Sequence, residues 1–357
     1  TPDAVSALTA NGHRVLFESG AGKGANFKDK DYSEAGAEVT KDTARVYSCP
    51  IILKVEPPSI DEISLINPQT ILISALQIKT QSKSYFEALA KKRITALAFE
   101  YIKDEDGAYP AVRSLSEIAG TASILIASEL LSNVNGGNGL MMGNINGVPP
   151  TEVLILGAGT VGEFAARSAI GLGANVKVFD SSITKLRCIQ NNLGRTIYTS
   201  TMQPKNLLKA LKRCDVAIGA VRGTNRSPIV VTDTMVDNMK RGSVIIDVSI
   251  DMGGCFETSE VTNHDKPTFE YNGVTHYCVP NIAARVPHSA SRAFSNVITG
   301  ILSKAHEYGG FENLLREYPG ICHGAYIYRG KLTNQFLSER FDLKYTDIEL
   351  LMAANYG

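Results

Sequence analysis

Three glycines that follow a short apolar run carry the clearest chemical signal in this sequence. Residues 152–156 read EVLIL, which predicts a buried parallel strand, and Gly157, Gly159 and Gly162 follow in the spacing G-x-G-x-x-G. The first glycine permits a tight turn, the second lets a pyrophosphate approach the backbone, and the third lets the next helix pack on the strand. That helix, predicted over 163–172, points its N-terminus at the phosphates. The pattern predicts a dinucleotide site.

An acidic residue stands where such a site needs one. Asp180 ends a second predicted strand, 175–179, and lies 18 positions beyond the last glycine. A carboxylate there accepts hydrogen bonds from the adenosine ribose and repels a 2′-phosphate, and no arginine follows at once, so NAD is favoured over NADP. The alternative is a strand–turn–helix with incidental glycines. From this stretch we expect cofactor contacts at Gly157, Gly159, Thr160, Val161, Gly162 and Asp180.

Further polar and loop residues follow the next predicted strands. A strand over 216–220 ends at Ala220 and Val221, and a strand over 243–248 is followed by Asp251. Ligands in open α/β sheets bind outside the carboxyl ends of the strands. We therefore place Ala220, Val221 and Asp251 at the edge where the cofactor lies. For Asp251 a plain turn or helix-cap role is the alternative.

A lysine stands inside a strand of the N-terminal third. Lys54 lies in the predicted strand 51–55, which Pro57 and Pro58 end. Its charge suits a carboxylate or carbonyl oxygen, and Glu100, at the end of another predicted strand, could orient it. A surface lysine whose stem covers apolar neighbours is the alternative.

The surrounding patterns predict two α/β domains. Strands and helices alternate over residues 13–100, which implies a parallel sheet of their own. A long helix over 114–131, capped by Ser114 with Glu117 three positions on, suits a crossing between domains, and a helix over 289–309 carries the chain back. The expected fold is α/β, with two doubly wound parallel-sheet (Rossmann-like) domains joined by long helices. The expected domains are a discontinuous substrate domain, 1–115 plus 289–357, and an NAD-binding domain, 116–288.

Composition narrows the class of protein. The 357 residues carry 36 Lys and Arg and 36 Asp and Glu, and this neutral balance argues against a nucleic-acid partner. The longest apolar stretch, 118–131, is interrupted by Glu129, so we expect no membrane partner. The six cysteines form no C-x-x-C pair and are expected to be reduced, buried thiols. We expect no metal site.

Several stretches together resemble the alanine dehydrogenase family, which shares ancestry with the NAD-binding subunit of proton-translocating transhydrogenase. The most specific piece is the run D-x-x-x-D-x-G-G-C-x-E-T-S within 244–259. The other matching pieces are GAGTVG (157–162), THYCVPNIAARVP (275–287), GAGKGANFKD (20–29), LKVEPP (53–58), AFEYI (98–102), SLSEIAG (114–120) and the dehydrogenase-like tail YIYRGKLTNQ (326–335).

The resemblance implies a reaction and roles for single residues. The reaction is the reversible, NAD-dependent deamination of L-alanine to pyruvate and ammonia through an imine, with hydride passing to the nicotinamide in a cleft between the domains. Lys54 is similar to the lysine that holds the 2-oxo acid, and Asp251 to the aspartate near the nicotinamide. Asn281 corresponds to the asparagine at the substrate–nicotinamide junction and Ser116 to a cofactor-contacting serine. A cytoplasmic homohexamer is also implied.

The chain departs from the family at the usual histidine. Gln77 stands at that position, and glutamine orients a substrate but does not transfer protons. The proton route would then run through Lys54, Asp251, a water or His288. The family's substrate-binding arginine corresponds to a position upstream of Thr1.

Two other functions stay open on this sequence. One is a transhydrogenase-like protein that relays hydride between cofactors, which needs no proton donor. The other is an NAD-binding sensor without turnover. The tail over 326–335 and the placement of Lys54 favour the dehydrogenase.

Overall fold

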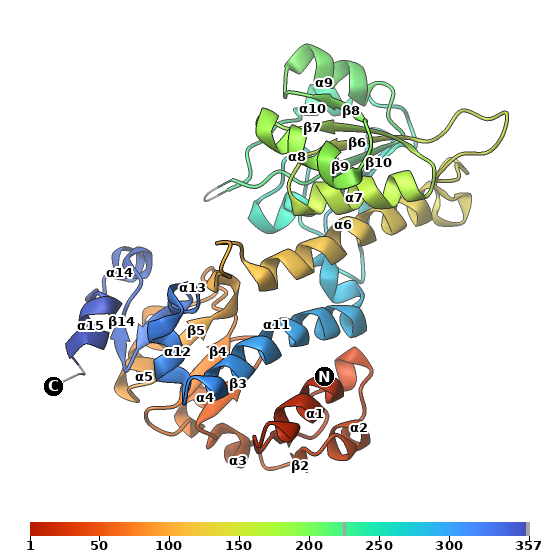
Figure 1. The fold of residues 1–357 in the computed structure, drawn as a ribbon. Coiled ribbons are helices and arrows are strands. Elements are labelled where there is room, and N and C mark those ends of the chain that lie inside the picture. Colours follow the sequence, from red (N-terminus) through yellow and green to blue (C-terminus); the bar gives the residue numbers. More distant parts are fainter. Residues whose placement is uncertain (224–225, 355–357) are drawn as a thin grey trace. The chain divides into compact units, whose positions relative to one another are not determined.

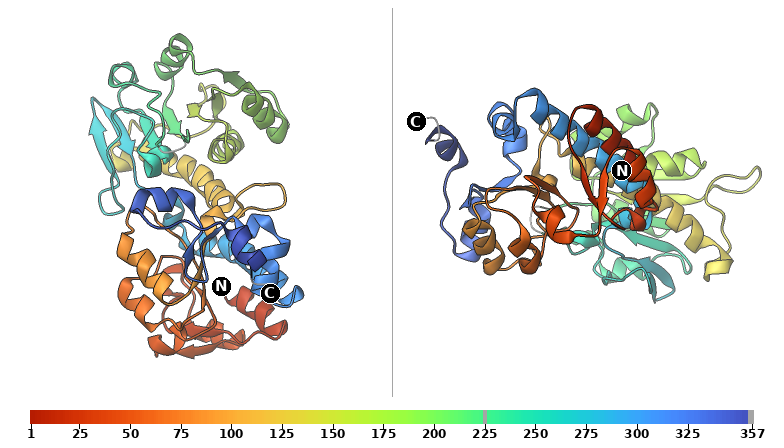
Figure 2. Two further views of the ribbon diagram at one scale, coloured as in Figure 1. Left: turned by 90° about the vertical axis from the view of Figure 1, so that its left-hand side faces the viewer. Right: turned by 90° about the horizontal axis from the view of Figure 1, so that it is seen from below.

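The computed structural model describes residues 1–223 and 226–354, and the chain divides into two compact units. The first unit consists of Thr1–Ser114 and Pro287–Gly357, and the second of Leu115–Val286. The helices at the two ends of the described chain, α1 (Pro2–Ala10) and α15 (Ile348–Ala354), therefore belong to the same unit (Figure 2).

The first unit is built on a five-stranded sheet in the order β14-β13-β5-β4-β3 (Figure 1). Strands β3, β4 and β5 run parallel, and the C-terminal segment adds β13 antiparallel to β5 and β14 antiparallel to β13. A separate parallel pair, β1 and β2, completes the strands of this unit. Their bounds are β1 Leu16–Glu18, β2 Glu38–Thr40, β3 Ile51–Leu53, β4 Ile71–Ser74, β5 Thr95–Ala98, β13 Ala325–Tyr328 and β14 Lys331–Leu332.

Helices cover the two faces of that sheet. Successive residues of one strand point to opposite faces, so Leu72 of β4 enters one apolar cluster with α5 and Ile73 enters another with α11 and α12. The further helices of the unit are α2 Asp29–Glu34, α3 Thr43–Tyr47, α4 Ile60–Leu65, α5 Lys83–Lys91, α11 Pro287–Glu307, α12 Phe311–Glu317, α13 Pro319–Cys322 and α14 Gln335–Phe341, with 3₁₀ turns η1 Lys23–Ala25 and η2 Phe99–Tyr101.

The second unit is built on a seven-stranded sheet in the order β11-β12-β10-β9-β6-β7-β8 (Figure 1). All of its neighbouring strands pair in parallel except β11 and β12. The strands are β6 Glu152–Leu156, β7 Asn175–Phe179, β8 Tyr198–Ser200, β9 Val216–Gly219, β10 Val244–Asp247, β11 Thr268–Tyr271 and β12 Val274–Tyr277.

The chain order makes the centre of this sheet a place where a ligand can bind. From β6 the chain builds outward through β7 and β8, then returns to place β9 on the other side of β6. Such a reversal leaves a crevice at the carboxyl ends of the two central strands. The helices between the strands of this sheet are α7 Thr160–Gly171, α8 Ile183–Leu193, α9 Pro204–Leu211 and α10 Asp233–Val236. The unit also contains the 3₁₀ turns η3 Asn133–Asn135, η4 Val248–Met252 and η5 Ile282–Arg285.

Both faces of the second sheet are buried at its central strands, β6, β9 and β10, which explains why these strands are mostly apolar. On β6, Val153 and Ile155 pack in the cluster that contains α6 and α7, whereas Leu154 and Leu156 pack with α9. The expectation of an α/β protein with two mainly parallel sheets is confirmed.

The long connecting helix begins earlier than expected. Helix α6 spans Pro110–Leu131, and proline favours the first turn of a helix. Ser114 therefore lies inside the helix, where its hydroxyl donates to the Pro110 carbonyl at 2.9 Å, and the capping box predicted at Ser114 is wrong. By length and composition α6 could cross a membrane, but 44% of its most apolar window is buried inside the protein.

The cysteines only partly follow the expectation. All six are free thiols, of which Cys214, Cys255, Cys278 and Cys322 are buried, whereas Cys188 is exposed and Cys49 is half-buried. Burial raises the pKa of Cys214 and of Cys278 to about 12, so these two thiols stay protonated and unreactive.

Candidate functional site

The glycine loop lies at the crevice between β6 and β9. Gly157 has φ of +110°, and a side chain there would overlap the carbonyl oxygen of Ala220 at the end of β9. A side chain at Gly162 would overlap the Gly157 carbonyl, so this glycine lets α7 sit directly on the loop. At Gly159, by contrast, an added Cβ would meet no heavy atom within 4 Å. The loop is thus closed where it packs and open where a phosphate would approach.

The open side also offers hydrogen-bond donors. Gly159 is the N-cap of α7 and has no side chain with which to cap the helix, so the N–H groups of the first turn, at Thr160 and Val161, are available to an anion. Asp180 is 8% exposed and its carboxylate accepts from the Ala158 N–H at 2.8 Å and from the Ser182 N–H at 2.7 Å. The carboxylate expected to bind the ribose therefore touches the glycine loop itself.

The segment after β10 is held by a buried aspartate, the first of the run D-x-x-x-D-x-G-G-C, for which the sequence predicted no role of its own. Asp247 accepts hydrogen bonds from the N–H groups of Ser249 (3.0 Å) and Cys255 (2.9 Å) and from the Ser259 hydroxyl (2.7 Å). Burial raises the pKa of this carboxyl, whereas these hydrogen bonds act to lower it. Asp247 thereby fixes both ends of the turn that contains Asp251.

This turn organises the neighbouring loop residues. The Ser249 hydroxyl accepts from the Val221 N–H at 2.9 Å, which ties the end of β9 to the end of β10. Asp251 accepts from the N–H of Asn281 at 2.8 Å, and Asn281 has the left-handed φ of +52°. The structure therefore brings Val221, Asp251 and Asn281 to the carboxyl edge of one sheet.

Ser116 lies on α6, four residues before Gly120. A side chain at Gly120 would overlap the Val161 carbonyl and crowd Phe164, so α6 contacts the first turns of α7 there. Residues four apart share one face of a helix, which puts Ser116 on the side of α6 that faces the first turns of α7.

In the first unit, Lys54, Gln77 and Glu100 follow β3, β4 and β5. These strands are parallel neighbours, so their carboxyl ends meet at one edge of the sheet. The Lys54 ammonium donates to both carboxylate oxygens of Glu62, each at 3.1 Å, and to the Tyr47 hydroxyl at 3.2 Å. We had expected Glu100 to orient Lys54, but the structure puts Glu62 beside the ammonium.

Glu100 instead holds the turn after β4. One of its carboxylate oxygens accepts from the Leu76 N–H at 2.7 Å, and the other is buried without a hydrogen-bond partner among the described residues. Burial raises the pKa of Glu100, against hydrogen bonds from backbone N–H groups that act to lower it. The next residue after Leu76 is Gln77, which is exposed and has φ of +47°.

His288, another candidate proton carrier, is the second residue of α11. Its Nδ1 lies 2.9 Å from the Ala25 carbonyl, and its ring stacks on Phe27 with the centroids 4.4 Å apart. It is therefore bound to the glycine-rich loop 19–27.

Two neighbours of the Lys54 ammonium, Glu62 and Tyr47, were not predicted from the sequence. A signal for Glu62 exists, because Ser59 with Glu62 three positions on forms a capping box at the start of α4. Nothing in the spacing indicates that Tyr47, at the end of α3, reaches the same carboxylate at 2.6 Å.

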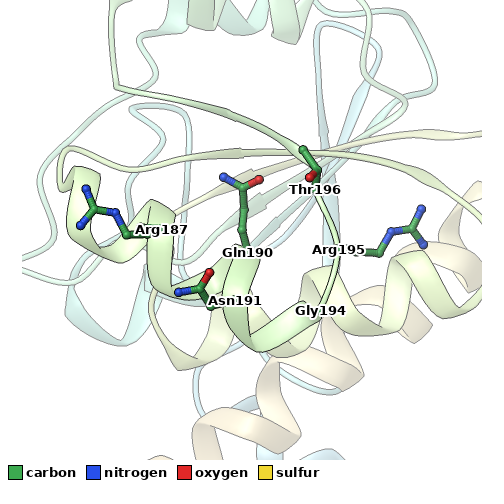
Figure 3. Close-up of a pocket in the computed structure, with 6 residues that line it drawn as sticks. All are labelled: Arg187, Gln190, Asn191, Gly194, Arg195 and Thr196. Atoms are coloured by element: carbon green, nitrogen blue, oxygen red, sulfur yellow. The ribbon is translucent and has the colours of Figure 1, made fainter.

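Figure 3 shows a surface hollow that is separate from these residues. Helix α8 starts at the carboxyl edge of the second sheet and runs back, so a hollow at its C-terminal end lies at the opposite edge from the glycine loop. The side chains of Arg187 and Arg195 point away from each other in that view. The lining residues are Arg187, Gln190, Asn191, Gly194, Arg195 and Thr196. Across residues 1–223 and 226–354, no group of three or more His, Cys, Asp or Glu could hold a metal ion.

Comparisons with known proteins agree with this geometry. The description "Alanine dehydrogenase/PNT, N-terminal domain" matches residues 1–119, and "Alanine dehydrogenase/PNT, C-terminal domain" matches residues 123–335. Alanine dehydrogenase 2 of Staphylococcus aureus (strain Mu50) is 35% identical over 352 residues, which are 98% of this chain and 94% of that protein.

Solved structures point to the same family. An L-alanine dehydrogenase superposes with a TM-score of 0.89 at 32% identity, covering 96% of this chain and 94% of the other. A transhydrogenase from Sinorhizobium meliloti has a TM-score of 0.79 at 24% identity, with 93% of each chain covered, and shares the fold. This chain belongs to the alanine dehydrogenase/PNT family.

Proposed function

We propose that this chain catalyses the reversible, NAD-dependent deamination of L-alanine to pyruvate and ammonia. The observation that carries the proposal is the 35% identity to an alanine dehydrogenase over 98% of the chain. The likeness covers both halves of the chain, since the N-terminal family description matches residues 1–119 and the C-terminal description matches residues 123–335. A likeness confined to the glycine loop would support only a dinucleotide fold.

The residues of the second unit fit NAD. Gly159 leaves space at the loop, the first turn of α7 has N–H groups for a pyrophosphate, and Asp180, which accepts from the loop at Ala158, is the proposed ribose ligand. Ala220, Val221, Asn281 and Ser116 are the further proposed contacts. When bound, the nicotinamide supplies the acceptor for the hydride that leaves the substrate.

The chain's own residues would bind and polarise the substrate. The Lys54 ammonium donates to the carboxylate or oxo oxygen of the 2-oxo acid, and Gln77 adds hydrogen bonds without moving protons. As Cα loses hydride and the amine loses a proton, the substrate becomes an iminium, whose charge the Asp251 carboxylate balances. Water then adds to the imine carbon and ammonia leaves, which gives pyruvate. Glu100 positions the turn that carries Gln77.

The test follows absorbance at the NADH band while purified protein is mixed with NAD and L-alanine, with other small amino acids in parallel. We expect turnover with L-alanine and its loss in the Lys54→Ala and Asp251→Ala variants, whereas Gln77→Ala keeps activity. If NADH binds but no amino acid is turned over, the dehydrogenase is excluded and a hydride-relay or sensor function takes its place.

We also propose that the protein is a cytoplasmic homohexamer that binds neither nucleic acid nor membrane. The support is its family membership and its balanced charge. Light scattering coupled to gel filtration measures the subunit number, and a mass other than six subunits contradicts the hexamer.

A further inference from the structure

Lys54 forms a hydrogen-bonded cluster with Glu62 and Tyr47. Its ammonium contacts Glu62 from α4 and Tyr47 from α3, and the Tyr47 hydroxyl donates to Glu62 at 2.6 Å. The three polar groups therefore form a closed triangle. With side-chain exposures of 26% for Lys54 and 34% for Glu62, the ion pair is partly shielded from water.

The Glu62 carboxylate of this cluster is itself held in place by Ser59. The Ser59 N–H donates to Glu62 at 2.7 Å, and the Glu62 N–H donates to the Ser59 hydroxyl at 3.2 Å, which makes the capping box that starts α4. Although burial acts to raise it, the hydrogen bonds from Tyr47, Ser59 and Lys54 together lower the pKa of Glu62 to about 2. Glu62 thus stays charged, and burial, together with the hydrogen bond to Glu62 and its negative charge, raises the pKa of Tyr47.

Counting donors leaves Lys54 one bond for a substrate. An ammonium has three N–H groups. The two Glu62 oxygens lie at the same distance of 3.1 Å and can share one of them, and the Tyr47 hydroxyl accepts a second. The third N–H is left to donate to a carboxylate or oxo oxygen. Glu62 and Tyr47 thus orient the Lys54 ammonium and leave one of its N–H groups for a substrate.

The arrangement also answers a chemical problem. A neutral amine beside a 2-oxo acid attacks the oxo carbon, and loss of water leaves a Schiff base. An ammonium has no lone pair and cannot attack. In an enzyme whose product is pyruvate, a deprotonated lysine at the substrate site would be trapped by that product.

We propose that Glu62, assisted by Tyr47, is a positioning residue that holds the Lys54 ammonium in its hydrogen bonds and aims it at the substrate, and so prevents its condensation with the 2-oxo acid. This inference rests on the proposed role of Lys54. Among the described residues, the charged and titratable groups in hydrogen-bond contact with the ammonium are Glu62 and Tyr47. Behind Tyr47 lies the Glu18 carboxylate, which accepts from Thr43 at 2.7 Å.

The first experiment compares full-length wild type with Glu62→Gln, because glutamine can still complete the capping box. In the direction that consumes pyruvate, ammonia and NADH, kcat/KM for pyruvate is measured against pH. We expect the alkaline limb of the variant to move to lower pH by about one unit, which means roughly tenfold lower kcat/KM on that limb. At the acidic end of the profile the two proteins should agree within a few-fold.

Glu56→Gln is the matched control, since Glu56 is an exposed carboxylate in the same stretch, and its profile should follow wild type. The second readout treats each protein with pyruvate and borohydride, which reduces a Schiff base to a stable amine. Mass spectrometry should find the adduct on Lys54 in Glu62→Gln and not in wild type. If Glu62→Gln does not fold, Tyr47→Phe replaces it and should shift the limb in the same direction.

The possible outcomes distinguish a failure of the proposed role of Glu62 from a failure of the proposed role of Lys54. If Lys54→Ala keeps full activity, the proposed role of Lys54 fails. If Lys54→Ala is inactive but Glu62→Gln keeps the wild-type profile and gives no adduct, only the inference is overturned.

Discussion

Carboxylates of this protein do different work because different groups donate to them. Asp180 receives two backbone N–H groups at the glycine loop, and Asp247, which is itself fully buried, receives backbone and hydroxyl donors. Glu62 receives an ammonium, a phenol and a backbone N–H. The second holds a turn, whereas we propose that the first binds a ribose and that the third positions the Lys54 ammonium.

The charge of Asp180 should decide between the two nicotinamide cofactors. In Asp180→Asn the side-chain oxygen can still accept from Ala158, but the charge that repels a 2′-phosphate is gone. We expect the ratio of the NADP to the NAD dissociation constant to fall about tenfold, which corresponds to about 1.4 kcal/mol. Titrations followed by protein or NADH fluorescence measure both constants. Equal affinities in the wild type would show that Asp180 does not bind the ribose.

Asp247 should matter for stability more than any exposed aspartate. Both carboxylate oxygens of Asp247 accept hydrogen bonds, from the N–H groups of Ser249 and Cys255 and from the Ser259 hydroxyl. In Asp247→Asn one oxygen is replaced by an NH₂ group, which cannot accept and would face at least one of these donors. We expect a loss of about 1–3 kcal/mol in the free energy of unfolding, measured by urea denaturation. Asp265→Asn, an exposed substitution on the same unit, is the control and should stay within about 0.5 kcal/mol of wild type. Equal stability of the two variants would contradict this role.

At the scale of elements, the contact between α6 and α7 positions the glycine loop. A side chain at Gly120 would meet backbone of α7, which cannot move aside without disturbing the loop before it. We expect Gly120→Ala to lower stability by about 1–3 kcal/mol and to weaken NAD binding. At Gly171, at the end of α7, an added Cβ meets no heavy atom within 4 Å. Gly171→Ala should therefore be neutral or stabilising by up to about 1 kcal/mol, and calorimetry with and without NAD compares the two.

The contribution of Glu62 to the free energy of unfolding, where α3, β3 and α4 meet, should depend on pH. The pKa of Glu62 is about 2 in the folded protein, below its ordinary value of 4.5. The stabilisation is therefore fully present above about pH 4.5 and is lost as pH falls toward 2. Glu62→Gln should flatten the pH dependence of unfolding in that window relative to wild type, as measured by chemical denaturation. An unchanged dependence would mean that Glu62 is no better stabilised in the folded than in the unfolded chain.

At the scale of the whole molecule, the sequence predicts what local patterns encode. The strand before Gly157 and the acidic residue after the second strand follow from spacing, because one βαβ unit contains them all. Contacts between distant elements leave no such pattern: Tyr47, Lys54 and Glu62 come from three elements. The start of α6 was missed because Pro110 and Ser114 both favour helix starts, and the proline prevails.

The division of the chain leads to a prediction about which pieces fold. The second unit is one continuous segment with apolar clusters on both sheet faces. The first unit is not, because β13 pairs with β5 across more than two hundred residues of sequence. We expect residues 110–286, which keep α6 whole, to unfold cooperatively and to bind NAD, with circular dichroism and NADH fluorescence as the measurements. Residues 1–114 alone should lack a cooperative transition, since the strand that covers β5 is missing. A cooperative transition in that fragment would show that β13 and β14 are dispensable to the first sheet.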